Sequence, residues 1–192
     1  RHRALERPGG SEAALPGLDS RDGRVLHAWD VTRATVTPDA QVLVIGTGLT
    51  MVDALLSLRE LGHRGIVHAI SRHGVLPLAH SDLHGRAQPL LSRSLRVAAR
   101  ELRLGCELDK RIGRPWQWRV DANRHHAQAF WIGLSHAEKR RFLRHARSFW
   151  DAHRHRIAQT QRDRLDAELA DGTLRIHRGR VGIIEPLRRA QR

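Results

Sequence analysis

The sequence predicts an α/β fold built on a strand–helix–strand unit, and three observations in residues 42–70 support this prediction. Residues 42–45 form a short β-branched apolar run, which is typical of a buried strand. Residues 49–61 are typical of a helix that Gly62 would end. Residues 66–70 form a second apolar run. The three elements therefore occur in the order of a βαβ unit.

Two closely spaced glycines join the first strand to the helix. The chain there reads Gly46, Thr47, Gly48, Leu49, Thr50 and Met51. Gly46 permits a tight turn, and Gly48, which lacks a Cβ, lets the backbone reach a diphosphate at the positive N-terminus of a helix. We therefore predict that these six residues bind a dinucleotide. Met51 occupies a position that usually holds a small residue, and its flexible thioether could fill a wider gap between helix and sheet.

The end of the second strand indicates which dinucleotide is preferred. An acidic residue about 20 positions after the glycines usually bonds the adenosine ribose. This chain has Ser71, Arg72 and His73 there instead. Arg72 can pair with the additional phosphate of NADP, and Ser71 can offer it a hydroxyl, so we predict NADP(H) rather than NAD(H). The alternatives are a solvated arginine and a glycine turn that binds no nucleotide.

The segments around this unit predict the domain organisation. Residues 1–39 are expected to be a linker and sheet-edge segment, and residues 40–170 a Rossmann-like, three-layer α/β domain with a helical insertion at about 90–160. Helices are expected at 90–104, ending near Gly105, and at 121–131, 135–157 and 161–170. Ser135 and Glu138 have the spacing of a capping box. Residues 174–177 and 181–184 are expected to be strands on either side of Gly179.

The helix expected at 135–157 carries an apolar stripe that we interpret as core. Its members recur at steps of three and four residues: Phe142, Ala146, Phe149, Trp150, His153 and Ile157. Arginines occupy much of the remaining surface of this helix, which raises nucleic-acid binding as a further hypothesis.

Composition argues against several other functions. The 192 residues include 34 Lys and Arg and 20 Asp and Glu, for a formal net charge of +14. Only Lys110 and Lys139 are lysines, and the arginines are spread along the chain, which favours a solvated surface over nucleic-acid binding. Cys106 is the single cysteine, so an intrachain disulfide and a cysteine-based zinc site are excluded. The histidines lack ligand spacing, and we expect no metal.

No stretch of the sequence approaches the length of a membrane span, and residues 1–10 lack the apolar core of a secretory signal. We therefore expect a cytoplasmic protein that binds no membrane. No elbow motif supports nucleophilic hydrolysis, and no catalytic residue can be assigned. The substrate and the oligomeric state have no signature in the sequence.

Three blocks of the chain resemble bacterial FAD/NAD(P)-binding proteins related to flavin-dependent monooxygenases, a group that includes a FAD-dependent urate hydroxylase. They are residues 42–53, residues 69–77 with His80, and residues 140–145 with 149–156. The resemblance implies a second, FAD-binding domain, to which residues 171–192 return as flanking strands. It also implies hydride transfer from NADPH to flavin.

In such proteins an N-terminal glycine fingerprint holds FAD, whereas this chain contains one fingerprint and no initiator methionine. We therefore expect a fragment whose flavin segment precedes Arg1 and which holds FAD poorly by itself. A non-catalytic nucleotide-binding or scaffolding module is the alternative from a different functional class.

Overall fold

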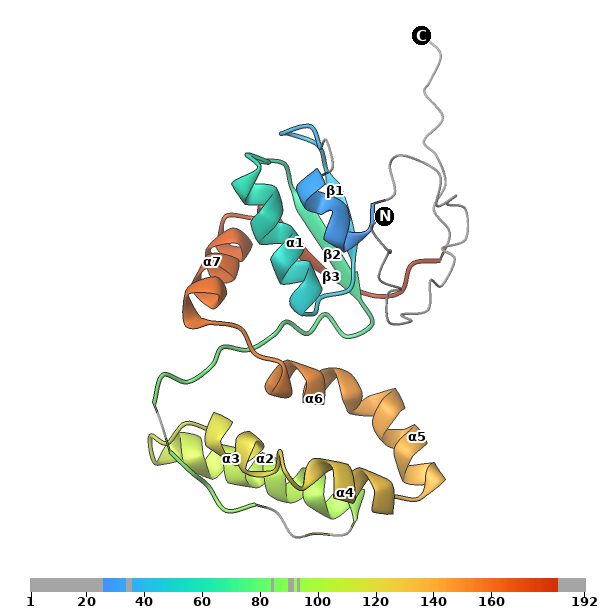
Figure 1. Ribbon diagram of the computed structural model, residues 1–192, viewed down its shortest axis with the longest axis vertical. Helices are drawn as coiled ribbons and strands as arrows, with labels where there is room; N and C mark the ends of the chain where they lie inside the picture. The colour runs from blue at the N-terminus through green and yellow to red at the C-terminus, as the bar shows by residue number, and fades with distance from the viewer. Residues whose placement is uncertain (1–25, 34–35, 84, 90–91, 93, 183–192) are drawn as a thin grey trace, which may run out of the picture.

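The computed structural model describes residues 26–33, 36–83, 85–89, 92 and 94–182 (Figure 1). These residues form an α/β unit with a three-stranded parallel sheet, and a group of helices is inserted between its second and third strands. The α/β class predicted from the sequence is thereby confirmed.

The first half of the α/β unit follows the prediction to within one residue. Strand β1 (Val42–Ile45) leads into helix α1 (Leu49–Glu60), and strand β2 (Val67–Ser71) returns parallel to β1. The register places Val42 opposite Val67 and Ile45 opposite Ile70. Gly62 follows α1 with a φ of +83°, a conformation that L side chains rarely adopt, so it ends the helix as expected.

The second half of the unit is completed after the insertion. Helix α7 (Gln159–Ala170) leads into strand β3 (Leu174–Arg178), which pairs in parallel with β2. The strand expected at 174–177 therefore belongs to this same sheet and does not pair in a separate one. Val181 and Gly182 are not in a strand, and residues 183–184 lie outside the described part of the chain.

Both helices of the unit cover one face of the sheet. Alternate strand residues pack into a core with Leu55 and Leu58 of α1 and Leu165 of α7. Right-handed crossovers between parallel strands that progress in one direction place their helices on the same side. On the opposite face Leu43 is 51% exposed and Ile45 is 49% exposed. The described residues thus form two layers, where three were predicted.

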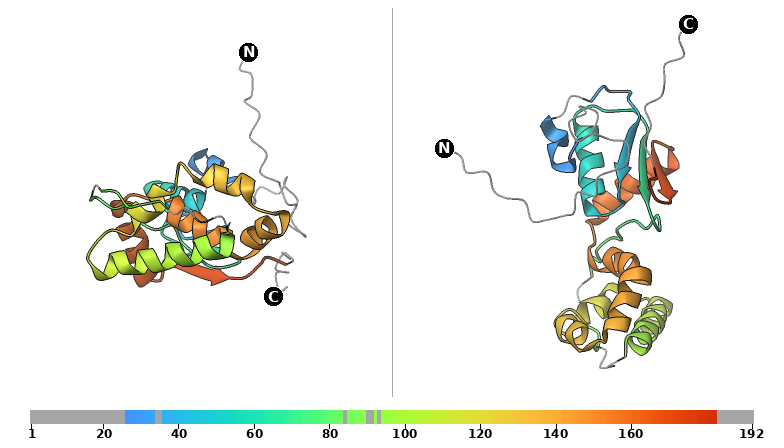
Figure 2. Two further views of the ribbon diagram at one scale, coloured as in Figure 1. Left: turned by 90° about the horizontal axis from the view of Figure 1, so that it is seen from below. Right: turned by 90° about the vertical axis from the view of Figure 1, so that its right-hand side faces the viewer.

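A short 3₁₀-helix, η1 (Ala28–Arg33), takes the place of the sheet-edge segment expected near the N-terminus. It lies beside α1 on the helical side of the sheet (Figure 2), and Val31 is buried in the shared core. Residues 1–25 of the expected linker lie outside the described residues.

In its described residues the insertion contains five helices. These are α2 (Leu95–Arg111), α3 (Gln117–Ala122), α4 (Ala127–Gly133), α5 (His136–His145) and α6 (Arg147–Arg154). The capping box of Ser135 and Glu138 at the start of α5 is confirmed. The helix expected at 121–131 is divided between α3 and α4, and the long helix expected at 135–157 is broken at Ala146.

The prediction that a helix ends near Gly105 was wrong. Helix α2 runs through Gly105, and a Cβ built there would collide with the side chain of Arg119 on α3. The glycine therefore serves close packing between two helices and is not a stop signal.

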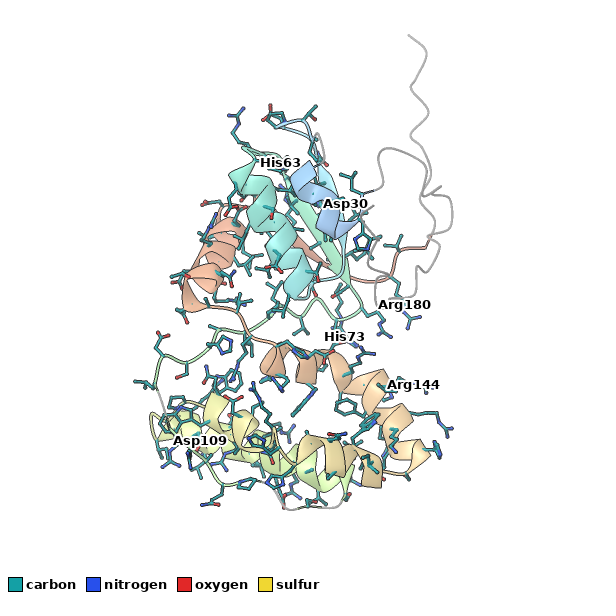
Figure 3. The ribbon with its side chains drawn as sticks, viewed as in Figure 1. Asp30, His63, His73, Asp109, Arg144 and Arg180 are labelled. Carbon is teal, nitrogen blue, oxygen red and sulfur yellow. The ribbon has the colours of Figure 1, made fainter. Side chains whose placement is uncertain are left out.

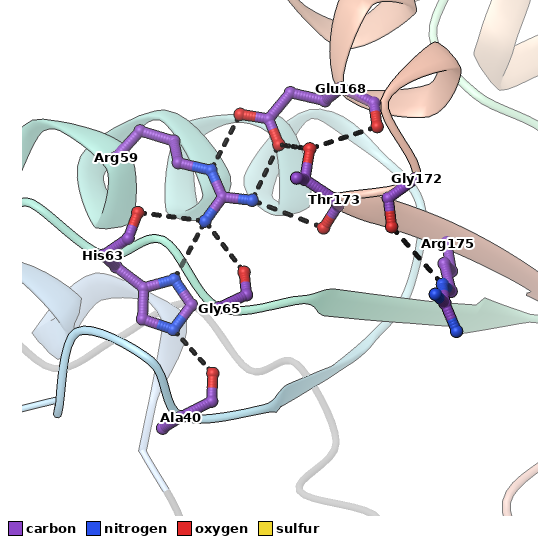
Figure 4. Close-up of polar contacts among 8 residues, drawn as sticks. All are labelled: Ala40, Arg59, His63, Gly65, Glu168, Gly172, Thr173 and Arg175. Carbon is purple, nitrogen blue, oxygen red and sulfur yellow. Dashed lines mark hydrogen bonds and ion pairs between the residues drawn. The ribbon is translucent and has the colours of Figure 1, made fainter.

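A polar cluster around Arg59 ties the α/β unit together (Figure 4). Arg59 Nε and Nη2 each donate to one carboxylate oxygen of Glu168 on α7, both at 2.7 Å. Its Nη1 donates to the carbonyl oxygens of His63 and Gly65 before β2, both at 3.0 Å. The side chains of Arg59 and Glu168 are 14% and 20% exposed, so this ion pair is largely shielded from water. Donation from Arg59 lowers the pKa of Glu168 below its ordinary value.

Glu168→Gln is expected to lower the free energy of unfolding by about 2 kcal/mol at pH 7, because a charge-assisted, partly buried contact is lost. Since the pKa of Glu168 is lowered in the folded protein, its stabilisation is full above the unfolded pKa of about 4.3 and is lost as pH falls through the lower folded value. Urea denaturation at pH 7 and at about pH 3 should show the difference shrinking in acid.

The matched control is Asp151→Asn, which removes an exposed i,i+4 pair with Arg147 on α6. This change is expected to alter stability by less than about 0.5 kcal/mol. Equal losses for the two variants at pH 7 would contradict the assigned importance of the Arg59 cluster.

Candidate functional site

The glycine turn lies at the carboxyl end of the parallel strands. Helix α1 begins there, and its N-terminus faces the helical insertion across the molecule (Figure 1). In open parallel α/β sheets this edge is where ligands bind. The sequence-predicted residues at the start of α1 and at the end of β2 are therefore brought to one edge of the sheet.

Gly46 and Gly48 serve different purposes in the turn. Gly46 has a φ of +113°, and its N–H donates to the carbonyl oxygen of Ile70 at 2.8 Å, which continues the pairing of β1 with β2. Gly48 has an ordinary φ of −88° and is the N-cap of α1, where no side chain caps the first turn. A Cβ built on either glycine meets no atom of the described residues within 4 Å. Open space therefore adjoins the uncapped helix start.

A chain of hydroxyl groups anchors this turn to the end of β2. Thr47, only 5% exposed, donates through Oγ1 to the Val75 carbonyl oxygen at 2.7 Å. Its Oγ1 also lies 2.8 Å from Ser71 Oγ, which accepts from the Gly74 N–H at 3.0 Å. Because the Thr47 proton is used on Val75, Ser71 must be the donor to Thr47. The Ser71 proton, expected to serve a phosphate, is thus engaged within the protein.

Arg72 and His73 follow this anchored serine. Arg72 is exposed directly after β2, beside the turn that Gly46 forms with Ile70. The ring of His73 contacts Phe149 of α6, with centroids 5.5 Å apart (Figure 3). The loop after β2 therefore touches the helical insertion. Sequence reasoning did not find this contact, because the two residues are far apart in the chain and share no motif.

The remaining predicted residues divide between solvent and core. Leu49 and Thr50 are exposed in the first turn of α1. Met51 is 2% exposed in the core beneath the turn, and its N–H donates to the Gly48 carbonyl oxygen at 3.1 Å. Of the predicted set, Met51 therefore supports the turn from below, whereas Leu49 and Thr50 present their backbone toward open space.

The described residues contain no group of three or more His, Cys, Asp or Glu side chains that could hold a metal ion. Burial raises the pKa of the Cys106 thiol above its ordinary value. A raised pKa disfavours the thiolate, which is the nucleophilic form. His80 and His84, four residues apart, could share a metal only if their loop were helical, and His84 lies outside the described residues.

The apolar stripe of residues 142–157, which the sequence analysis interprets as core, lies mostly on the wall of a cavity. Phe142, Ala146, Phe149, Trp150 and His153 line a cavity of about 1460 Å³ inside the insertion. Phe149 is 49% exposed, whereas Ile157, the last member of the stripe, is buried in the core of the α/β unit. Helical periodicity found the stripe, but it could not distinguish a wall of a cavity from a core.

Comparison with known proteins identifies no relative: no protein-family model, no curated protein and no solved structure matches this chain. Among the described helices, none combines the length and the apolar character that crossing a membrane requires. The chemistry of the site must therefore be inferred from its own geometry.

The two glycines are expected to respond differently to alanine. Gly46→Ala should lower the free energy of unfolding by about 1–3 kcal/mol, because alanine would have to adopt a strained positive φ. Gly48→Ala should change it by less than about 1 kcal/mol, because its φ suits any residue and the added Cβ meets open space. Urea denaturation of both variants measures the contrast. Similar losses would contradict the described turn.

Proposed function

We propose that this chain contains the NAD(P)H-binding part of a FAD-dependent, monooxygenase-like oxidoreductase, in which hydride passes from NADPH to flavin. One observation carries the proposal: the exposed, uncapped N-terminus of α1 follows the Gly46–Gly48 turn at the carboxyl ends of parallel strands. The strand order β1–β2–β3 with α1 and α7 on one face supports a Rossmann-like half of a doubly wound sheet.

The helix start has the properties that a diphosphate requires. Gly48 has no side chain to cap this helix start, the first N–H groups of a helix lack intrahelical acceptors, and the helix dipole makes this end positive. The absence of a Cβ at Gly46 and Gly48 leaves the space beside the backbone clear. Residues 47–50 would offer main-chain donors to the diphosphate, while Gly46, whose N–H donates to Ile70, leaves space for it. Thr47 and Met51 keep the turn in place from within.

The adenosine end supports NADPH over NADH. Arg72 lies exposed at the end of β2, next to the glycine turn, and a guanidinium forms two parallel hydrogen bonds to a phosphate. Because the Ser71 hydroxyl proton is engaged with Thr47, Arg72 would be the principal side chain that recognises the 2′-phosphate.

The cofactors supply the redox chemistry, since a bound nicotinamide donates hydride and a bound flavin accepts it. The described residues contribute binding and orientation of the nucleotide, and no side chain is assigned a catalytic role. The support for FAD comes from the resemblance of residues 42–53, of 69–77 with His80, and of 140–145 with 149–156 to FAD/NAD(P)-binding proteins related to flavin-dependent monooxygenases. The substrate is not specified by this site.

The folded chain is expected to bind NADPH, and Gly48→Ala should weaken that binding at least tenfold, because a methyl group would occupy the space that the diphosphate needs. Isothermal titration calorimetry measures both affinities, and the unfolding measurement for the same variant shows that the fold is intact. A folded wild-type chain that binds no NADPH would overturn the proposal and leave the scaffolding module as the explanation.

Arg72→Ala is expected to weaken NADPH binding by about 10- to 100-fold and to change NADH binding by less than about threefold, because only NADPH carries the 2′-phosphate. Arg140→Ala on α5, which removes an exposed arginine elsewhere, is the matched control and should affect neither ligand. Equal weakening of NADPH and NADH by Arg72→Ala would exclude recognition of the 2′-phosphate by Arg72.

A further inference from the structure

The aromatic residues of this chain are concentrated around one space. The cavity of about 1460 Å³ in the helical insertion is lined by all three phenylalanines and three of the five tryptophans: Phe130, Phe142, Phe149, Trp116, Trp131 and Trp150. In the described residues the core of the α/β unit contains no aromatic side chain. The aromatic side chains therefore do not build the main core but surround the cavity.

The walls of the cavity are amphipathic helices whose apolar sides are packed together only in part: Trp131 contacts Phe142, and Trp116 contacts His153. Leu95, Ala98 and Leu102 of α2 recur at helical spacing along one wall, and the stripe of α5 and α6 forms another. Of the residues of α2, only Asp109 is buried, although the helix has 17 residues. Two helices with apolar faces this large normally bury them against each other. Here the faces line open volume instead.

Polar contacts at two ends hold these walls apart. Asp109 of α2, fully buried, accepts from Arg119 Nε and Nη2 of α3 at 2.7 and 2.8 Å (Figure 3). Near the other end the Leu95 N–H of α2 donates to Glu138 of α5 at 3.2 Å. The pKa values of both carboxyls are lowered, because Arg119 donates to Asp109 and Ser135 donates to Glu138. An ion pair thus connects α2 to α3, and a hydrogen bond connects α2 to α5. Both contacts form at the edge of the cavity and leave its centre open.

The charge of the lining is positive. Arg96, Arg103, Lys110 and Arg141 line the cavity together with only two carboxylates. One of these, Glu138, already accepts from Ser135 and Leu95. Aromatic walls favour a flat ring system, which can stack on indole and phenyl faces, and an excess of cations favours a negative charge on the same molecule.

We propose that this cavity is a binding site for a planar aromatic anion, such as an aryl carboxylate or sulfonate with fused rings. Its volume exceeds the roughly 300–1,000 Å³ of most small-molecule pockets, so it accommodates several rings. The site is distinct from the dinucleotide site, and its wall meets the loop after β2 where Phe149 contacts His73. Binding there does not depend on the proposed oxidoreductase function.

The test uses two fluorescent probes, 8-anilinonaphthalene-1-sulfonate and its uncharged analogue N-phenyl-1-naphthylamine. The sulfonate is expected to bind the folded chain at a single site and to quench tryptophan emission by energy transfer, with an unchanged near-ultraviolet circular dichroism spectrum. Ala98→Phe fills part of the cavity and should weaken both probes at least tenfold, whereas Ala137→Phe, on the exposed side of α5, should weaken neither. If Ala98→Phe does not fold, Ala99→Leu fills the same wall.

The charge of the ligand is tested separately. Arg103→Gln with Arg141→Gln should weaken the sulfonate about tenfold and leave the uncharged probe within twofold. The matched control is Arg100→Gln with Arg144→Gln, on the same helices but outside the lining, and it should change neither probe. Absence of sulfonate binding, or binding that cavity filling does not change, would overturn the site. Equal effects of the Arg103 and Arg141 changes on both probes would overturn its preference for anions.

Discussion

The ion pair between Arg59 and Glu168 closes the α/β unit around its insertion. The two residues are 109 positions apart, and between them the chain leaves the sheet, forms five helices and returns. Arg59 uses all three of its nitrogens, which reach α7, the carbonyl oxygens before β2 and the carbonyl oxygen of Thr173 before β3. Because these contacts hold α1 and α7 side by side, the sheet acquires a covered face, and β1 and β2 end together at the edge where the glycine turn lies.

Hydrogen bonds of two hydroxyl groups fix the glycine turn at this edge of the sheet. The hydroxyls of Thr47 and Ser71 form a directed chain from the Gly74 N–H to the Val75 carbonyl oxygen. The Ser71 proton is donated to Thr47 and the Thr47 proton to Val75, so both hydroxyl protons are used within the protein. The helix start itself has no side-chain cap. The turn is therefore rigid on its inner side and accessible on its outer side, which is the arrangement that binding of an anion by main-chain donors requires.

The helical insertion follows a different principle from the α/β unit. The unit buries aliphatic side chains of α1, α7 and the strands in a continuous core. The insertion buries fewer apolar residues, and in it Asp109 pairs with Arg119 and Arg156 pairs with Asp121. Hydrophobic association alone would bring its apolar faces together. In the insertion, charged pairs join helices beside a few apolar contacts, and six aromatic side chains line the cavity. The two parts meet where His73 packs on Phe149.

Local sequence signals predicted the elements that depend on local physics. The β-branched run at 42–45, the glycine at 62 and the capping box at 135 each act within a few residues, and the structure contains β1, the end of α1 and the start of α5 at those places. At Gly105 the local signal misled, because this glycine accommodates Arg119 from another helix and does not end α2. The break at Ala146 has no mark in the local sequence. Likewise, the helical periodicity of apolar residues predicted the stripe at 142–153, but it could not predict the cavity that the stripe lines.

The sequence by itself therefore determined the βαβ unit, the glycine turn and the basic residue after β2, since strand and helix propensities and the freedom of glycine are properties of short segments. Only the tertiary structure decided that residues 174–178 join the same sheet, that the Ser71 proton is engaged and that the aromatic side chains surround a cavity. Each of these outcomes depends on groups brought together from distant parts of the chain, where packing and hydrogen-bond geometry, and not local preference, select the arrangement.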